Sequence, residues 1–339
     1  MRRGSSWKYL AVISTLCLFP LISGCGDSSG DGSPGLTYTG ATSPAVITSS
    51  NAAGLIGSAY TGGNSGISVG DITAGVKHLD NGVSRRPRSL TISRALIKFV
   101  HLTAIDHTLA MPETAATASN IPRSTLNGNC GGTATVDGSY DDADHTISLS
   151  ANLSSYCQDG MKLNGTIGAL GQAIADRQNN INISNVTITL ANLSASYEGG
   201  TFTASGTMSI TPQPEYTYVD NNILLTINML LKDNATTKVY KLANFRISQS
   251  STIGTISYDD ITITGRFYDP DSGYIDLSTP TAIRILNDDV WPSSGSLRAG
   301  GADCSATLTA LSDITYQLDV DSDGNGSVDS SESGLWANI

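Results

Sequence analysis

Between about residue 126 and residue 320, the chain is a succession of short runs in which apolar and polar residues alternate. Turn-forming residues separate these runs at intervals of ~8 to 15 residues, a texture that predicts a series of β-strands. The predicted strands are 133–140, 145–156, 186–190 with 193–197, 201–210, 223–231, 239–247, 253–258, 261–268, 274–277, 282–286, 305–311 and 314–320. The sequence therefore predicts a mainly β fold, an antiparallel meander that forms a sandwich or an open barrel.

Glycine and proline mark several of the predicted turns. Pro270 presets φ for a turn that Gly273 can complete with a positive φ, and Asp233-Asn234 is a similar turn signal. A glycine that opens an alternating run recurs at Gly131, Gly165, Gly206 and Gly254. The irregular spacing of these glycines disfavours a strict solenoid. Pro212 and Pro214 interrupt the strand series and predict a crossing between two sheets.

Residues 36–120 have a mixed texture. Segment 44–48 predicts a short strand, and Ser49, Ser50 or Asn51 is a suitable N-cap for a helix over 52–60. A second helix is predicted over 89–109, and a loop over 111–122 comes after it. One side of the second helix carries Leu96, Phe99, Val100, Thr103 and His107 at helical spacing. A small helical N-terminal part, residues 36–120, is thus expected before an antiparallel β domain, residues 121–339.

The first 25 residues predict export and a lipid anchor. Arg2 and Arg3 precede an apolar stretch, 9–22, that is too short for a membrane span of about 20 residues and is typical of a signal peptide. The stretch ends in Ile22-Ser23-Gly24-Cys25, with small residues before the cysteine. This segment resembles a bacterial lipobox, and the resemblance implies cleavage before Cys25 and attachment of diacylglycerol and acyl chains to that residue. An ordinary secretory signal with a coincidental cysteine is the alternative.

The lipoprotein resemblance also bears on location. Gly26, and not Asp, comes directly after Cys25, which by resemblance favours the outer membrane, on its periplasmic or surface face. Segment 26–35 has a composition typical of a flexible tether, with an r.m.s. reach of about 17 Å. The Cys-Gly-Gly, Tyr-Cys-Gln-Asp-Gly and Leu-Asn-Gly texture of segment 126–170 is similar to that of uncharacterised β-rich bacterial lipoproteins. That similarity implies no activity.

The acidic balance of the chain excludes one class of partner. Without the three basic residues of the leader, 16 basic residues face 30 acidic ones, and the net charge changes from −11 to −14. Such a surface repels nucleic acid and anionic lipid headgroups. The cluster Arg85, Arg86 and Arg88 is short and predicts a solvated loop. No nucleic-acid partner is therefore expected, and the lipid anchor is the expected contact with the membrane.

Three cysteines lie beyond Cys25: Cys130, Cys157 and Cys304. Export permits disulfides. A hairpin centred between residues 143 and 144 would place Cys130 opposite Cys157, so this pair is the predicted disulfide, and its closure would stabilise the fold by about 3.5 kcal/mol. Free thiols are the alternative, and Cys304 is left as a buried thiol or an alternative partner.

The sharpest chemical motif is segment 321–332, which resembles the twelve-residue calcium loop of EF-hand-like proteins. By that resemblance the metal ligands are Asp321, Asp323, Asn325, Ser327, Asp329 and Glu332. Gly326 permits the sharp turn, oxygens of alternate residues converge on one ion, and the final glutamate can bind with both oxygens.

The flanks of this motif differ from a helix–loop–helix pair. Residues 314–320 alternate in polarity, so a strand is expected to enter the loop, and Gly334 comes soon after Glu332. A single strand–loop site, as in dockerin-like or thrombospondin-type loops, is therefore favoured, with a Kd of about 10⁻⁴ to 10⁻³ M and a structural role at the C-terminus. The alternative is an acidic hairpin turn, between 314–320 and 334–339, that binds no ion.

Other patterns carry weaker signals for chemistry. The acidic pairs are Asp141/Asp142, Asp259/Asp260, Asp269/Asp271 and Asp288/Asp289. Two carboxylates across a cleft could support glycoside hydrolysis, but predicted turns commonly carry aspartate. The histidines His78, His101, His107 and His145 have no zinc-site spacing. The candidate sugar-stacking rings are Tyr216, Tyr218, Tyr258, Tyr268, Tyr274 and Trp291, although strands favour tyrosine for structural reasons.

These features predict a lipid-anchored cell-envelope protein with a non-catalytic binding or structural role and one structural calcium site. Its expected partner is an envelope protein or a glycan. A carbohydrate-binding lipoprotein is the alternative, and a hydrolase that uses an aspartate pair is a third candidate. No catalytic residue is assigned.

Overall fold

The computed structural model describes residues 35–61 and 119–338, except for residues 142, 159, 176–180, 198–199, 213–222, 253, 255, 287–288 and 290. All of these residues belong to one compact unit, Gly35–Ile339. The predicted signal peptide with Cys25, the tether up to residue 34 and the predicted helix over 89–109 lie outside the described residues. The described part of the chain contains no helix with the length and apolarity needed to cross a membrane.

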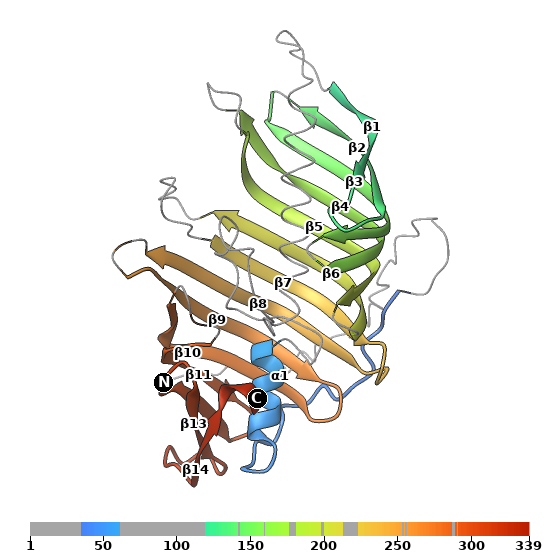
Figure 1. Cartoon of the computed structure of the whole chain (residues 1–339). Coiled ribbons are helices and arrows are strands. Elements are labelled where there is room, and N and C mark those ends of the chain that lie inside the picture. Colours follow the sequence, from blue (N-terminus) through green and yellow to red (C-terminus); the bar gives the residue numbers. More distant parts are fainter. Residues whose placement is uncertain are drawn as a thin grey trace, which may run out of the picture. The chain divides into compact units, whose positions relative to one another are not determined.

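Within the described residues, fourteen strands form a single antiparallel sheet in which every strand lies beside its neighbours in sequence (Figure 1). The strands are β1 (Ser119–Asn127), β2 (Thr133–Asp141), β3 (Thr146–Gln158), β4 (Met161–Ala175), β5 (Ile181–Tyr197), β6 (Gly200–Pro212), β7 (Ile223–Asp233), β8 (Val239–Thr252), β9 (Tyr258–Asp269), β10 (Gly273–Leu286), β11 (Ser294–Gly300), β12 (Ser305–Ala310), β13 (Thr315–Asp321) and β14 (Ser330–Leu335). β1 and β14 are the outermost strands, so the sheet is open. The predicted mainly β, antiparallel meander is confirmed, and its strands share one sheet.

The hairpin formed by β2 and β3 has the predicted register. Thr133 pairs with Ser154 and Asp141 pairs with Thr146, which is the register of a hairpin centred between residues 143 and 144. The turn predicted at Pro270 joins β9 to β10. Local alternation and turn chemistry thus determined both the pairing and the position of these connections.

Two expectations about strand limits are wrong. The run 253–258 does not give a strand of its own, because β8 ends at Thr252, β9 begins at Tyr258, and residues 254, 256 and 257 between them are not in a strand. Pro212 is the last residue of β6 and pairs with Ile223 at the start of β7. These two strands are therefore neighbours in one sheet, and no crossing occurs there. A proline is tolerated at a strand end because a missing backbone N–H disturbs the ladder least at that position.

Four strands are not anticipated by the sequence pattern: β1, β4, β11 and β14. β4 carries Gly165, Gly168 and Gly171, and glycine has a low strand propensity. β14 has the sequence SSESGL, with one apolar residue. Both strands form because long or regular neighbours offer a complete ladder of backbone partners, and this tertiary pairing outweighs the local preference.

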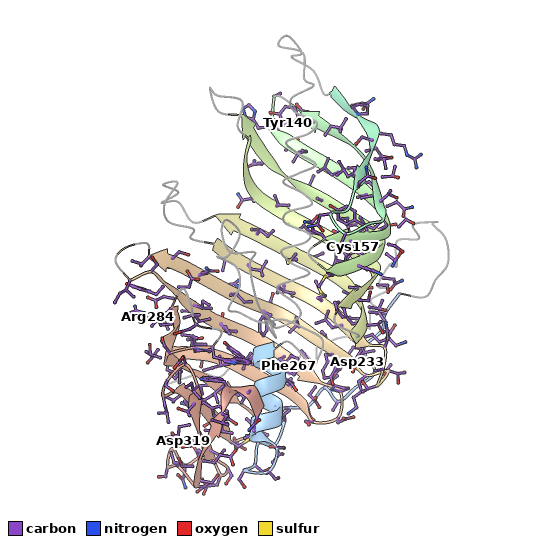
Figure 2. The ribbon with its side chains drawn as sticks, in the orientation of Figure 1. Tyr140, Cys157, Asp233, Phe267, Arg284 and Asp319 are labelled. Atoms are coloured by element: carbon purple, nitrogen blue, oxygen red, sulfur yellow. A yellow bond between two sulfur atoms is a disulfide. The ribbon has the colours of Figure 1, made fainter. Side chains whose placement is uncertain are left out.

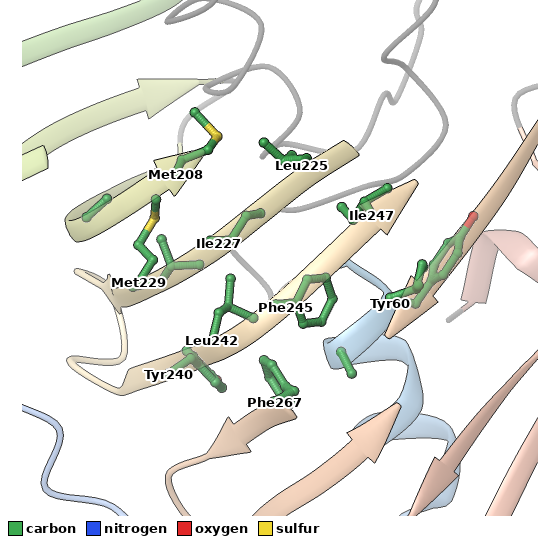
Figure 3. Packing of buried hydrophobic residues seen from close by; sticks show 14 of the residues in the cluster. Tyr60, Met208, Leu225, Ile227, Met229, Tyr240, Leu242, Phe245, Ile247 and Phe267 are labelled. Carbon is green, nitrogen blue, oxygen red and sulfur yellow. The ribbon is translucent and has the colours of Figure 1, made fainter. Parts of the chain in front are cut away.

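Alternate residues of the strands contribute to one continuous apolar core. In β3, for example, Ile147, Leu149, Ala151 and Leu153 are buried, while the residues between them are exposed. Figure 3 shows the central strands, where aromatic and aliphatic side chains of β7, β8 and β9 pack closely around Phe245. Full burial of each large side chain of this kind contributes roughly 1.5–3 kcal/mol, so the core is the main source of stability.

Helix α1 (Ala52–Thr61) adds its apolar side to the same core and confirms the helix predicted over 52–60. Leu55 and Ile56 are buried, and the helix contacts β12 and β13. The Asn51 side chain accepts a hydrogen bond from the backbone N–H of Thr48 (2.8 Å). Asn51 therefore closes the turn that leads into the helix.

The segment before α1 is held by the sheet without becoming a strand of it. Instead of the strand predicted over 44–48, Pro44 forms an isolated bridge with Tyr274. The backbone N–H of Ile47 donates a hydrogen bond to Sγ of Cys304 (3.0 Å), and Cys304 is a buried, free thiol. Of the two possibilities that the sequence left open for Cys304, a buried thiol or an alternative disulfide partner, the structure has the buried thiol.

A line of β-bulges crosses the sheet from β3 to β9. The residues with positive φ along it are Ser155, Gly165, Asn192, Gly206, Asn244 and Gly265. Register shifts occur beside them in the pairs β3–β4, β4–β5, β5–β6, β7–β8 and β8–β9. Oδ1 of Asn164 accepts the N–H of Ser155, and Oδ1 of Asn228 accepts that of Asn244 (2.7 Å each). Bulges bend and twist strands, so this line is where successive strands change direction together.

Candidate metal centre

The loop between β13 and β14 gathers three aspartates of the predicted calcium motif. β13 ends at Asp321 and β14 begins at Ser330, so residues 322–329 connect two neighbouring antiparallel strands. One carboxylate oxygen each from Asp321, Asp323 and Asp329 can be chosen so that all three lie within 4.8 Å of one another. Within the described ranges, no other group of three His, Cys, Asp or Glu side chains fits a metal ion. Three negative charges at this spacing repel, so a cation would stabilise their arrangement.

Hydrogen bonds from backbone to side chain give the loop its curled path. Oδ2 of Asp321 accepts the N–H of Gly326 (3.0 Å), and Oδ1 of Asp323 accepts the N–H of Asn325 (3.1 Å). Oδ1 of Asn325 accepts the N–H of Ser327 (2.7 Å). Gly326 has a φ of +87°, a conformation that glycine adopts without strain. Local turn chemistry therefore helps to bring Asp321 and Asp323 close together.

Asp321 provides a second and independent indication of a metal ion. Its side chain belongs to a residue that is only 8% exposed, and its Oδ1 atom is buried and accepts no hydrogen bond. A buried polar atom without a partner costs about 1–3 kcal/mol, and more when it is charged, so native structures rarely keep one. A cation bound beside the three carboxylates would supply the missing partner. The residues present therefore fit a metal ion.

Asp329 is prepared for metal binding by Ser322. Oδ2 of Asp329 accepts hydrogen bonds from the hydroxyl and from the backbone N–H of Ser322. The hydroxyl bond first, and then the backbone bonds, lower the pKa of Asp329 below its ordinary value of 3.8. The stability that these bonds contribute is fully present above about pH 3.8 and is lost as the pH falls through the folded-state pKa. Asp329 is therefore ionised at neutral pH, as a metal ligand must be.

The other predicted ligands are placed in two different ways. Asn325 and Ser327 lie in the same exposed loop as Asp323 and Asp329. Glu332 lies on β14, opposite Leu318, and is not part of the group formed by the three aspartates. Burial first, and then the negative charge of Glu332, raise the pKa of Tyr316 on β13. The assignment of the six residues as ligands stays a prediction.

A second loop, which the sequence motif does not indicate, lies against the metal-binding segment. A Cβ atom at Gly324 would overlap with the backbone carbonyl of Asp303, a residue between β11 and β12. The pairing of Ser305 with Asp321 brings these two loops together. Because this contact joins residues far apart in sequence, only the strand pairing reveals it.

Comparisons of the chain with protein-family models, with curated proteins and with solved structures find no match.

The predicted disulfide is present and lies far from the metal centre in the sheet order. Cys130, in the connection between β1 and β2, is bonded to Cys157 of β3, with the Cα atoms 5.0 Å apart (Figure 2). The N–H of Cys130 donates to the carbonyl of Cys157 (3.3 Å), and the N–H of Cys157 donates to the carbonyl of Gly131 (2.8 Å). The crosslink therefore fixes the first connection of the sheet onto β3.

Described members of the acidic pairs make contacts within the protein. Arg284 donates two hydrogen bonds to Asp260 (2.8 and 2.7 Å). Asp269 accepts backbone N–H bonds inside the turn between β9 and β10, and Asp271 forms an ion pair with Lys238. Asp142 and Asp288 lie outside the described residues. The Asp269 contacts are those expected of a turn residue.

The candidate sugar-stacking rings are also in contact with protein groups. These rings are Tyr258 (3.8 Å from its centroid to Arg284 Cζ), Tyr274 (3.7 Å to Arg266 Cζ), Tyr268 (5.6 Å to the Tyr38 ring) and Trp291 (6.0 Å to the Trp336 ring). Arg284 lies near the end of β10, at the left of Figure 2. Tyr216 and Tyr218 lie outside the described residues. The cation–π contacts of Arg284 with Tyr258 and of Arg266 with Tyr274 stabilise the sheet surface by about 0.5–1 kcal/mol each.

His145 is the one histidine of the chain within the described residues. Its Nδ1 atom lies 3.2 Å from the hydroxyl oxygen of Tyr140, at the turn between β2 and β3. His78, His101 and His107 lie outside the described residues. The contact of His145 with Tyr140 is that of a turn residue with its own hairpin.

Proposed function

We propose that this chain is a lipid-anchored protein of the cell envelope, with a non-catalytic binding or structural role, whose C-terminal hairpin is held by a calcium ion. The observation that carries the calcium site is the buried, unpaired Oδ1 of Asp321 beside the carboxylates of Asp323 and Asp329. Ca²⁺ takes six to eight oxygen ligands in flexible geometry, whereas Mg²⁺ demands a near-octahedral set and keeps several waters. An irregular loop of carboxylate, amide and carbonyl oxygens therefore favours Ca²⁺.

The residues that would hold the ion also define its role. Asp321, Asp323 and Asp329 would bind it, and by resemblance Asn325, the carbonyl of Ser327 and Glu332 would complete the set. The ion would neutralise the carboxylates and fix the connection between the last two strands. A Kd of about 10⁻⁴ to 10⁻³ M is sufficient for this structural role outside the cytosol.

The envelope location rests on the leader and is supported by the disulfide. Residues 1–25 resemble a lipobox leader that ends at Cys25, and Gly26 favours the outer membrane. The Cys130–Cys157 disulfide agrees with export, because disulfides persist mainly in oxidising compartments. With a strongly negative net charge, the expected partners are an envelope protein or a glycan, and not nucleic acid.

Calorimetry on the purified, processed protein tests the calcium site. After treatment with a chelator, calcium titration is expected to show one site with a Kd of about 10⁻⁴ to 10⁻³ M. The heat should disappear in Asp321→Ala and persist in Asp137→Asn, which changes an exposed aspartate on β2. A wild-type protein that gives no heat with calcium would reject the site.

Metabolic labelling tests the lipid anchor separately. Cells fed a palmitate analogue should label the wild-type protein in the outer-membrane fraction, and Cys25→Ser should abolish the label. Detergent extraction and then pull-down would identify the envelope partner. An uncut leader or a bare sulfur at Cys25 would reject the anchor and leave the calcium proposal standing.

A further inference from the structure

Strand β14 is attached to the molecule by its ladder to β13 and by contacts at its two ends. It is an outermost strand of the sheet and, among the residues that the structure describes, pairs with β13 alone, from Val320–Ser330 to Thr315–Leu335. Residues 331–333 are exposed, and Leu335 is 47% exposed. β14 therefore gains little from the apolar core, and its position depends on the β13 ladder and on the contacts made at its two ends.

The first end of β14 is the metal-binding loop. Asp329 immediately precedes the strand and belongs to the group of three aspartates. The hydroxyl of Ser331 donates a hydrogen bond to Oδ1 of Asp319 on β13 (2.6 Å), which ties the same end of the two strands together. Without a cation, mutual repulsion of the three carboxylates acts directly on the connection that aligns β14 with β13.

The second end of β14 is an aromatic cluster around Trp336, the residue directly after the strand. Trp336 is 3% exposed, and its ring lies 5.2–6.1 Å from the rings of Tyr60, Trp291 and Tyr316. Its Nε1–H donates to the carbonyl of Ser312 (2.9 Å). The backbone N–H of Trp336 donates to the carbonyl of Ile314 (3.0 Å). Through Tyr60, the cluster joins the end of β14 to helix α1.

We propose that cation binding at Asp321, Asp323 and Asp329 acts as a latch for β14. The bound ion keeps β14 paired with β13 and keeps Trp336 in the aromatic cluster, and loss of the ion releases both. This inference rests on the proposed calcium site and adds the element that the site controls. The physical basis is linkage, because a ligand that binds only the paired form shifts a local opening equilibrium toward that form. An outermost strand with few buried side chains opens at a lower free energy than the core strands.

Hydrogen exchange measured by mass spectrometry on the full processed chain tests the latch. At a free calcium concentration about 100 times the Kd, peptides that cover β14 and Trp336 should exchange about 100-fold more slowly than in chelator. Peptides from β9 and β10 should be unaffected. Tryptophan emission gives a second readout, since processing at Cys25 removes Trp7 and leaves Trp291 and Trp336, which are both in the cluster. Calcium should shift this emission to shorter wavelength.

Matched variants distinguish the proposed effect of calcium on β14 from calcium binding as such. Asp329→Asn should remove the calcium effect on β14 exchange, and Asp137→Asn should retain it. Calcium heat in calorimetry with unchanged β14 exchange would overturn the latch and leave the site. Equal slowing in β9, β10 and β14 would also overturn it, because the ion would then stabilise the whole fold. An absence of calcium heat would overturn both.

Discussion

Asp321 is the residue in which stability and binding conflict most directly. It ends β13, it is 8% exposed, and one of its carboxylate oxygens accepts no hydrogen bond. A well-packed hairpin would place a neutral or apolar residue at such a position. A local conflict of this kind is expected at functional sites, where binding determines the choice of residue.

The substitution Asp321→Asn should separate the effect of Asp321 on stability from its effect on calcium binding. In chelator, the free energy of unfolding should rise by about 1 kcal/mol, because one of three mutually repelling carboxylates is replaced by an amide while an oxygen remains to accept the Gly326 N–H. With calcium at about 100 times the wild-type Kd, the calcium-dependent gain should fall from about 2.7 kcal/mol to less than about 0.5 kcal/mol. Denaturant unfolding with and without calcium measures both values. A variant that keeps the full calcium gain would exclude Asp321 as a ligand.

The burial of Tyr60 should make the free energy of unfolding depend on pH in the alkaline range. Burial raises the pKa of Tyr60 above its ordinary value of 10.0. The unfolded chain therefore ionises first, and the stability linked to this group is fully present below about pH 10 and falls by about 1.4 kcal/mol per pH unit above it. Tyr60→Phe should remove this part of the loss, so its stability should change less than that of the wild type between about pH 8 and about pH 11. Identical pH profiles would show that Tyr60 ionises as easily in the folded state.

The candidate site divides into residues that sequence can find and residues that it cannot. Asp321, Asp323 and Asp329 come together through the turns of one short loop, so their spacing alone indicated them. Whether Glu332 could join them depends on where β14 begins, and this is set by pairing with β13. The contact of Asp303 with Gly324 depends on the register of β12 and β13. Spacing motifs contain no information on either long-range pairing.

At the scale of elements, the bulge line explains why glycines recur in the strands. At Gly206 and Gly265, φ is +140° and +116°, and a Cβ atom would overlap with the backbone carbonyl of Asn228 or Asn244 on the next strand. Only glycine permits both the backbone conformation and the close approach. Two of the four glycines that recur irregularly in the sequence, Gly165 and Gly206, are therefore bend positions.

The substitution Gly206→Ala should destabilise the fold by about 1–3 kcal/mol, since it introduces both a strained φ and a backbone overlap. Gly168→Ala is the matched control, because a Cβ at Gly168 in β4 would make only ordinary contacts, with Thr189 Cβ and with the carbonyl of Leu149. Gly168→Ala should be neutral or should stabilise by up to about 1 kcal/mol. Chemical denaturation of the two variants measures the difference, and equal effects would contradict the role of the bulge line.

The elements that sequence predicted are those whose signal is local. Alternation and a central turn were sufficient for the β2–β3 register, and the N-cap candidates were sufficient for α1. The glycine-rich β4 and the polar β14 escape detection because their neighbours impose the strand conformation. The strand predicted over 253–258 is wrong for the opposite reason. Its residues are suited to a strand, but it lies where β8 must turn back to β9.

At the scale of the whole molecule, an open sheet must protect its two outermost strands. Unpaired strand edges invite association with other chains. β1 carries Pro122 and a register shift between Ile121 and Ser124, and both features weaken it as a template. The Cys130–Cys157 disulfide crosslinks the connection directly after β1, and the metal loop connects β14 to its neighbour. A crosslink therefore lies next to each outermost strand, covalent beside β1 and, as proposed, ionic beside β14.

The two crosslinks should act independently, because they lie at opposite ends of the strand order and share no contacts. Replacing Cys130 and Cys157 by serine should lower the free energy of unfolding by about 3.5 kcal/mol, since the lost crosslink spans a sequence separation of 27 residues. Removing calcium in this variant should cost the same further amount as in the wild type, within about 0.5 kcal/mol, as expected for distant sites. Urea unfolding of both proteins, with calcium and with chelator, completes the thermodynamic cycle. A coupling free energy well above about 0.5 kcal/mol would mean that the disulfide and the calcium site affect each other through the sheet. The two crosslinks would then not be independent.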